Sequence, residues 1–105
     1  EAQGRIDEAL ARYGDVLELA AGLADSSLAI DARLNRARLL ARRGEHAAAA
    51  QLLDAAWRDA EALDNPMVRT GVRLARADQA LLAGETVAAR GHVEEARADL
   101  EGHEH

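Results

Sequence analysis

The sequence contains no cysteine, a single proline and only two aromatic residues, and each shortage restricts what the chain can be. Without cysteine there are no disulfides and no thiolate metal sites, which suits a reducing compartment. β-Branched residues are few, so strands are poorly supported. The apolar residues, 49% of the chain, are mostly alanine and leucine, which favours helices that approach closely through small side chains. We therefore expect an all-α domain.

Long apolar runs and excess positive charge are also missing. No stretch approaches the roughly 20 apolar residues that span a bilayer, and no basic and apolar signal segment opens the sequence. The formal net charge is −6, which argues against nucleic-acid binding because phosphate neutralisation supplies most of that affinity. All 13 basic residues are arginine, and with the abundant alanine this indicates a GC-rich genome. We expect a cytoplasmic domain that binds neither membranes nor nucleic acid.

A repeat with a period of forty residues runs through the chain. Gly44 has counterparts forty residues away on either side, at Gly4 and Gly84. The same offset relates three further sets, which we call the ladder: Ala9, Ala49 and Ala89; Tyr13, Leu53 and Val93; Val16, Ala56 and Ala96. The register holds over two periods without an insertion. The sequence therefore predicts a single array with a half repeat at 1–24 and full repeats at 25–64 and 65–102.

Each full repeat contains two predicted helices separated by a glycine. First helices are expected at 28–43 and 67–83, second helices at 45–63 and 85–101, and an earlier copy of the second helix at 5–23. Gly44 and Gly84 end the first helices, where left-handed backbone favours glycine. The turns between repeats are 24–27, with Asp and Ser as expected N-caps, and 64–66, where Pro66 suits a first helical turn. Five helices result.

The ladder residues of each copy lie at i, i+4 and i+7, on one face of a helix. Alanine at the position shared by all three copies lets antiparallel helices approach, where leucine would overpack. An alanine five residues after the turn glycine, a bulky residue four later and a small residue three later resembles the tetratricopeptide repeat. The segments LNRARLLARRGEHAAAAQLLDAA and LARADQALLAGETVAARGHVEEA are similar to repeats in sensor regions of large bacterial transcription regulators of the maltose-activator type.

This resemblance implies a solenoid of antiparallel helical hairpins whose first helices line a concave surface. It also implies a role in protein–protein interaction and signal transduction, as a fragment of a multidomain regulator. One departure from the family is that arginines replace the bulky aromatic and leucine residues early in the first helix, at Arg33, Arg36, Arg73 and Arg76. Arginine stems can still cover apolar surface there.

Charge is sorted between the two kinds of helix. Residues 28–43 carry five arginines against one acidic residue, whereas residues 45–63 carry four acidic residues against one arginine. With first helices on the concave surface, the groove is more positive than the whole molecule and suits an acidic peptide or a small anionic effector. Arg38 and Arg42 are one turn apart with Asn35 nearby, and they could converge on a carboxylate or phosphate. The candidate ligand- or partner-binding residues are Asp31, Leu34, Asn35, Arg38, Arg42, Leu74 and Asp78. The alternative is that basic and acidic helices pair with each other across their edges.

Catalysis, metal binding and cofactors are not expected. Hydroxyl groups occur only at Tyr13, Ser26, Ser27, Thr70 and Thr86, and none has a histidine at helical spacing to act as a base. His46 follows a turn and is interpreted as half-buried packing. The segment of His103, Glu104 and His105 could bind an adventitious divalent ion. Because it lies at a terminus, it provides no preorganised coordination geometry.

Tyr13 takes the bulky ladder position and is interpreted as a core residue. Trp57 has no aromatic counterpart in the other copies and is interpreted as packing between repeats; the alternative is an anchor for a partner or a second copy. Glycines inside predicted helices, at Gly14, Gly71 and Gly91, cost about 1 kcal/mol each relative to alanine, and close helix approach is the expected compensation.

We therefore expect a non-catalytic scaffold that binds a protein, a peptide or an effector. The alternative is a helical spacer or oligomerisation module without a ligand. Residues 1–3 are interpreted as the tail of a missing first helix, so the array starts in mid-repeat and leaves an apolar face on the 5–23 helix. We expect homo-oligomers to form through this face or through the Trp57 face.

Overall fold

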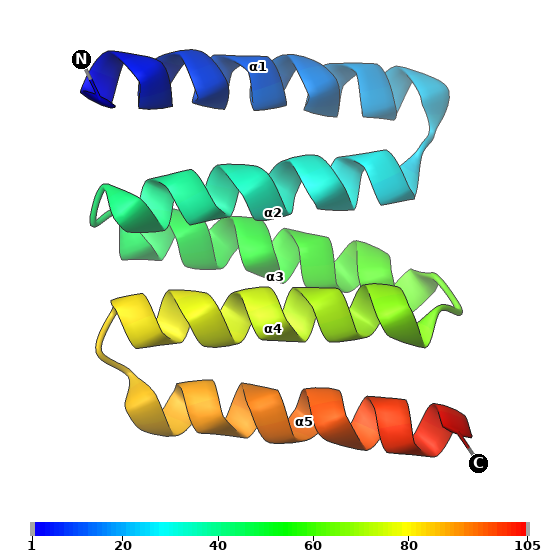
Figure 1. Ribbon diagram of the computed structural model, residues 1–105. Coiled ribbons are helices and arrows are strands. Elements are labelled where there is room, and N and C mark those ends of the chain that lie inside the picture. Colours follow the sequence, from blue (N-terminus) through cyan, green and yellow to red (C-terminus); the bar gives the residue numbers. More distant parts are fainter. Residues whose placement is uncertain (1, 105) are drawn as a thin grey trace.

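The computed structural model describes the backbone of residues 2–104 and the side chains of residues 3–102. Five helices follow one another along the chain (Figure 1): α1 (Ala2–Leu23), α2 (Ser26–Arg42), α3 (His46–Ala62), α4 (Pro66–Leu82) and α5 (Thr86–Glu104). No strand occurs in this part of the chain, which confirms the all-α class. Neighbouring helices run antiparallel in a flat molecule of 46 × 36 × 17 Å, so most helices have one face open to solvent.

The turns that end α2 and α4 have the same backbone geometry. Gly44 and Gly84 adopt left-handed φ angles of 82° and 81°. The Glu45 N–H donates to the Leu40 carbonyl at 2.9 Å, and the residue after Gly84 repeats this bond at 2.8 Å. This pattern, in which glycine follows the C-cap, satisfies carbonyls that the helix end leaves free. The prediction that these two glycines end helices is confirmed.

Gly4 does not share that role. α1 is one continuous helix from Ala2 to Leu23, so Gly4 and Gln3 lie inside it. The interpretation of residues 1–3 as the tail of a separate helix is therefore wrong for residues 2 and 3, and residue 1 lies outside the described part. A helical backbone at Gly4 keeps the i to i+4 hydrogen bonds unbroken, which a left-handed glycine would interrupt.

The helices that open the two hairpins begin at side-chain caps. Asp25 Oδ1 accepts a hydrogen bond from the backbone N–H three residues later at 3.0 Å, and Asn65 Oδ1 accepts one from the N–H two residues later at 3.0 Å. Pro66 occupies the first turn of α4, as predicted. Ser26 and Ser27 are not caps, contrary to expectation, because Asp25 already fills that position and both serines lie within the first turn of α2.

The core consists of small side chains where the helices meet. Buried residues form two clusters. The first contains Ile30, Ala56, Ala60 and Val72. The second contains Ala37, Ala41, Ala49 and Leu53. The ladder residues of α3 are at most 2% exposed, and both ladder alanines of α5 are 3% exposed. The ladder positions of α3 and the ladder alanines of α5 are therefore buried where helices meet. Val93 is an exception, at 39% exposure.

The ladder residues of α1 are less buried than their counterparts. Ala9, Tyr13 and Val16 are all half-buried, because α1 packs only against α2, the helix that follows it, whereas α3 and α5 also pack against the helices that precede them. Tyr13 is therefore not the fully enclosed core residue that its position suggested. The ladder of α3 is covered by α2, the helix that precedes it, and α1 has no such helix among the described residues.

The glycines inside helices are not explained by close packing. A Cβ atom added at Gly71 or Gly91 would meet no other atom within 4 Å, so the expected close approach is wrong at both positions. At Gly14 the added Cβ would lie 3.2 Å from Nη1 of Arg36, the mobile end of a long side chain. Of these three glycines, only Gly14 makes a contact that a larger residue would disturb.

Candidate binding face on helices α2 and α4

Several arginines of the basic helices pair with carboxylates on neighbouring helices; these are Arg33, Arg43, Arg73 and Arg76. Arg33 on α2 pairs with Asp59 on α3, and Arg73, forty residues later, pairs with Asp99 on α5 at 2.6 Å. Both pairs join a basic helix to the acidic helix that follows it. For these arginines the structure confirms pairing between helices, and their charge is not available to a ligand.

The contact between α4 and the preceding α3 has a counterpart between α2 and α1. Arg76 on α4 bonds Asp54 on α3 at 2.8 Å. Arg36, forty residues before Arg76, lies against Gly14, forty residues before Asp54. The two contacts share a register, but glycine offers no carboxylate. Arg36 therefore has no ion pair within residues 3–102, whereas Arg76 pairs with Asp54.

Trp57 is covered by the same network of arginines. The guanidinium carbon of Arg73 lies 4.2 Å from the centroid of the indole ring, and that of Arg76 lies 5.3 Å from it. Trp57 also packs against the buried cluster that includes Val72. The ring thus joins α3 to α4, which supports the interpretation of Trp57 as packing between repeats.

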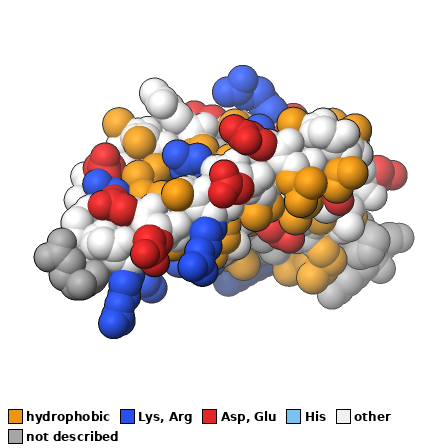
Figure 2. All heavy atoms as spheres, turned by 90° about the horizontal axis from the view of Figure 1, so that it is seen from above, with side chains coloured by type: hydrophobic (Ala, Val, Ile, Leu, Met, Phe, Trp, Pro, Cys, Tyr) orange, Lys and Arg blue, Asp and Glu red, His pale blue; other side chains and the backbone are white. Residues whose placement is uncertain are grey.

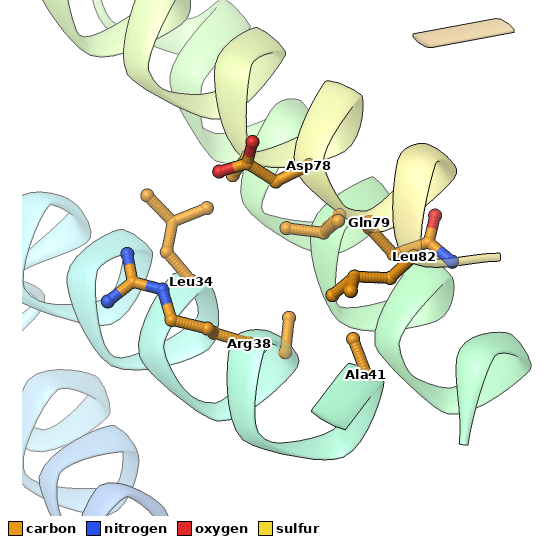
Figure 3. A pocket seen from close by; sticks show the side chains of 9 residues that line it. Leu34, Arg38, Ala41, Asp78, Gln79 and Leu82 are labelled. Atoms are coloured by element: carbon orange, nitrogen blue, oxygen red, sulfur yellow. The ribbon is translucent and has the colours of Figure 1, made fainter. Parts of the chain in front are cut away.

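A pocket lies between α2 and α4 above α3 (Figure 3). It is lined by Leu34, Ala37, Arg38, Ala41, Leu53, Ala75, Asp78, Gln79 and Leu82, and it encloses about 40 Å³. The floor is apolar, with alanine and leucine side chains from three helices. Arg38 from α2 and Asp78 from α4 stand on opposite sides of the opening. Neither belongs to an ion pair within residues 3–102.

The candidate residues chosen from the sequence divide into two groups. Leu34, Arg38 and Asp78 line the pocket together. The remaining four do not line it: Asp31, Asn35, Arg42 and Leu74. Asn35 donates from Nδ2 to the Asp31 carbonyl of its own helix at 3.0 Å, so it does not converge with Arg38 and Arg42 on one point. Leu74 is 45% exposed on the same helix as Asp78.

Sequence reasoning missed six lining residues: Ala37, Ala41, Leu53, Ala75, Gln79 and Leu82. Two signals could have found some of them. Ala41 follows Leu34 and Arg38 at helical spacing, and Gln79 directly follows Asp78. No sequence signal indicates that Leu53, on a helix between the other two, would form the floor.

Among the described side chains there is no group of three or more residues that could hold a metal ion. His46 is half-buried, as expected, and its Nδ1 has no hydrogen-bond partner, nor has Nδ1 of His92 or the buried Thr70 hydroxyl. The expectations for His103 and His105 fall on side chains outside the described residues.

No protein-family model, curated protein or solved structure matches this chain. Within residues 2–104, no helix combines the length and the apolar character needed to cross a bilayer.

Proposed function

We propose that this chain is a non-catalytic scaffold of the tetratricopeptide kind, part of a bacterial cytoplasmic regulator, that binds a peptide segment of a partner protein. The observation that carries the proposal is the apolar pocket between α2 and α4, with Arg38 and Asp78 at its opening and in no ion pair within residues 3–102. Charged side chains beside an apolar pocket orient a bound peptide, while the apolar contact in the pocket provides most of the binding affinity.

The size of the pocket favours a side chain over a free effector. Sites that enclose small ligands typically measure about 300–1,000 Å³. A cavity of about 40 Å³ has room for the end of one aliphatic side chain. Leu82, which lines the pocket, and Leu74 on the same helix are 56% and 45% exposed and extend the apolar contact along α4. A peptide with an aliphatic residue flanked by an acidic residue towards Arg38 and a basic residue towards Asp78 fits this arrangement.

Selection from a random peptide library displayed on phage tests the proposal. We expect the selected peptides to share an aliphatic residue with opposite charges on its two sides. Arg38→Glu should weaken their binding by at least about tenfold, since it replaces attraction by repulsion, and a new selection on this variant should favour basic residues at that position. Arg58→Glu, at an exposed arginine on α3, is the matched control and should leave binding unchanged.

A second variant and its control test the contribution of the apolar pocket independently of the charges at its opening. Ala75→Leu narrows the opening from a half-buried position, whereas Ala98→Leu adds the same side chain at an exposed position of α5. Only the first should reduce peptide affinity. If neither Arg38→Glu nor Ala75→Leu alters the binding of selected peptides, the pocket is not the binding site. If no peptide is selected at all, the chain is better described as a helical spacer.

A further inference from the structure

The forty-residue repeat creates two equivalent positions in the molecule. In the second position α4 packs against α3 and α5, and in the first position α2 packs against α1 and α3 (Figure 1). All of these helices belong to the described residues. The two positions can therefore be compared one side chain at a time.

At the second position an indole ring lies against two arginines. The guanidinium carbons of Arg73 and Arg76, both on α4, lie 4.2 and 5.3 Å from the ring centroid of Trp57 on α3. Arg76 also bonds Asp54, three residues before the tryptophan, at 2.8 Å. This position thus combines an aromatic ring and a carboxylate with a pair of arginines.

At the first position the arginines are kept and their partners are missing. Arg33 and Arg36 are on α2, but α1 carries Leu17 in place of the tryptophan and Gly14 in place of the aspartate. A Cβ added at Gly14 would lie 3.2 Å from Nη1 of Arg36, so this guanidinium lies against the place from which a carboxylate would reach it. Arg36 forms no ion pair within residues 3–102. An aromatic ring and a carboxylate are the two groups that α1 does not supply.

The space beside these arginines is open. Leu17 and Arg33 line a groove of about 250 Å³ between α1 and α3, together with alanines of α1 and α2. The Arg33 side chain is 27% exposed, against 16% for Arg73, which the indole covers. Arg36 lines a more open groove of about 360 Å³ farther along α2. Both arginines are therefore accessible to a ligand.

The surroundings do not attract carboxylates in general. The net charge is −6, and seen from above, over α1, charged side chains of both signs are interspersed with apolar ones (Figure 2). Two carboxylates, Asp25 and Asp59, also line the smaller groove. Asp25 caps α2 and Asp59 pairs with Arg33. An anion in the groove is therefore attracted locally, at Arg36, and repelled from the end near Asp25.

We propose that the groove over α2, between α1 and α3, binds a small aromatic carboxylate. The aromatic ring lies beside Leu17 against the guanidinium groups of Arg33 and Arg36, as the indole of Trp57 lies against their counterparts on α4. The carboxylate pairs with Arg36 above the backbone of Gly14. A groove of about 250 Å³ has room for one ring system, which favours a small molecule. The site shares no residue with the pocket between α2 and α4 and is independent of peptide binding there.

Isothermal titration calorimetry with indole-3-acetate, which carries both groups, tests the proposal on the full chain. We expect saturable binding of one molecule per chain, because Trp57 already occupies the equivalent position over α4. Indole-3-ethanol lacks the charge and acetate lacks the ring, so each should bind at least about tenfold more weakly. Equal affinities for indole-3-acetate and indole-3-ethanol overturn the proposal.

Three variants test where the ligand binds. Leu17→Trp supplies the ring from α1, so it should weaken binding at least about tenfold and raise the melting temperature. Gly14→Asp supplies the carboxylate and Arg36→Gln removes the charge, and each should weaken binding by a similar factor. Arg90→Gln, at an exposed arginine of α5, is the matched control and should leave the affinity unchanged.

Circular dichroism should show equal helicity for these variants, so that a loss of binding reports on the groove and not on the fold. A chain that binds no indole-3-acetate overturns the proposal. So does binding that Leu17→Trp and Arg36→Gln leave unchanged, because the ligand then lies elsewhere on the molecule.

Discussion

Replacing Arg73 by alanine should destabilise the fold more than replacing Arg33, its counterpart forty residues earlier. Both arginines pair with an aspartate on the following helix. Arg73 also stacks on Trp57 and pairs with Glu95, so it joins α3, α4 and α5, whereas Arg33 joins only α2 to α3. The two variants therefore measure what the additional contacts contribute.

The contacts of Arg73 differ in strength because they differ in exposure. Asp99 is 25% exposed and receives a charge-assisted hydrogen bond, which contributes about 1.5–2 kcal/mol. The arginine side chain is 16% exposed, and its position over the indole adds about 1 kcal/mol. Glu95 is 55% exposed, so its ion pair with Arg73 adds little to the free energy of unfolding. The sum for Arg73→Ala is about 2–3 kcal/mol, against about 1 kcal/mol for Arg33→Ala.

Urea denaturation followed by circular dichroism measures both free energies of unfolding, and the melting temperature should fall on the order of 10 °C for Arg73→Ala. Arg73→Lys should recover part of the loss, because lysine keeps the charge but not the planar group that stacks on the ring. Equal losses for Arg73→Ala and Arg33→Ala would refute the reasoning. The same would follow if Arg73→Ala left the tryptophan fluorescence of Trp57 unchanged.

The remaining predictions concern single backbone and hydroxyl positions, each read from the free energy of unfolding in urea. Gly71→Ala should stabilise by about 1 kcal/mol, because the new methyl group meets no atom and alanine favours the helix; a loss would mean an undetected clash. Gly44→Ala should destabilise by about 1 kcal/mol, since its φ of 82° strains any L residue. Ala24→Gly should stabilise the fold, because Ala24 has a left-handed φ of 53°, which glycine adopts without strain. Thr70→Val should stabilise by about 1 kcal/mol by removing a buried hydroxyl that has no partner.

The helices and their ends could be predicted because their causes are local. Alanines at helical spacing and a glycine at each hairpin turn depend on nothing outside a short window of chain, and the forty-residue period repeats these local signals. The predictions failed where a local pattern met a different environment. Gly4 repeats the spacing of Gly44 but lies inside a helix, and Tyr13 repeats the position of Leu53 but has a neighbour on only one side.

The sequence by itself determined that α2 is basic and α3 acidic, but it could not separate paired arginines from unpaired ones. That difference depends on how each helix is rotated about its axis against its neighbours, which only packing sets. Arg33 faces Asp59, while Arg38, little more than one turn later, faces the pocket. The pocket itself contains side chains from α2, α3 and α4, far apart in the chain. Tertiary structure alone brought them together, because their proximity arises from three helices in contact and not from any spacing within one.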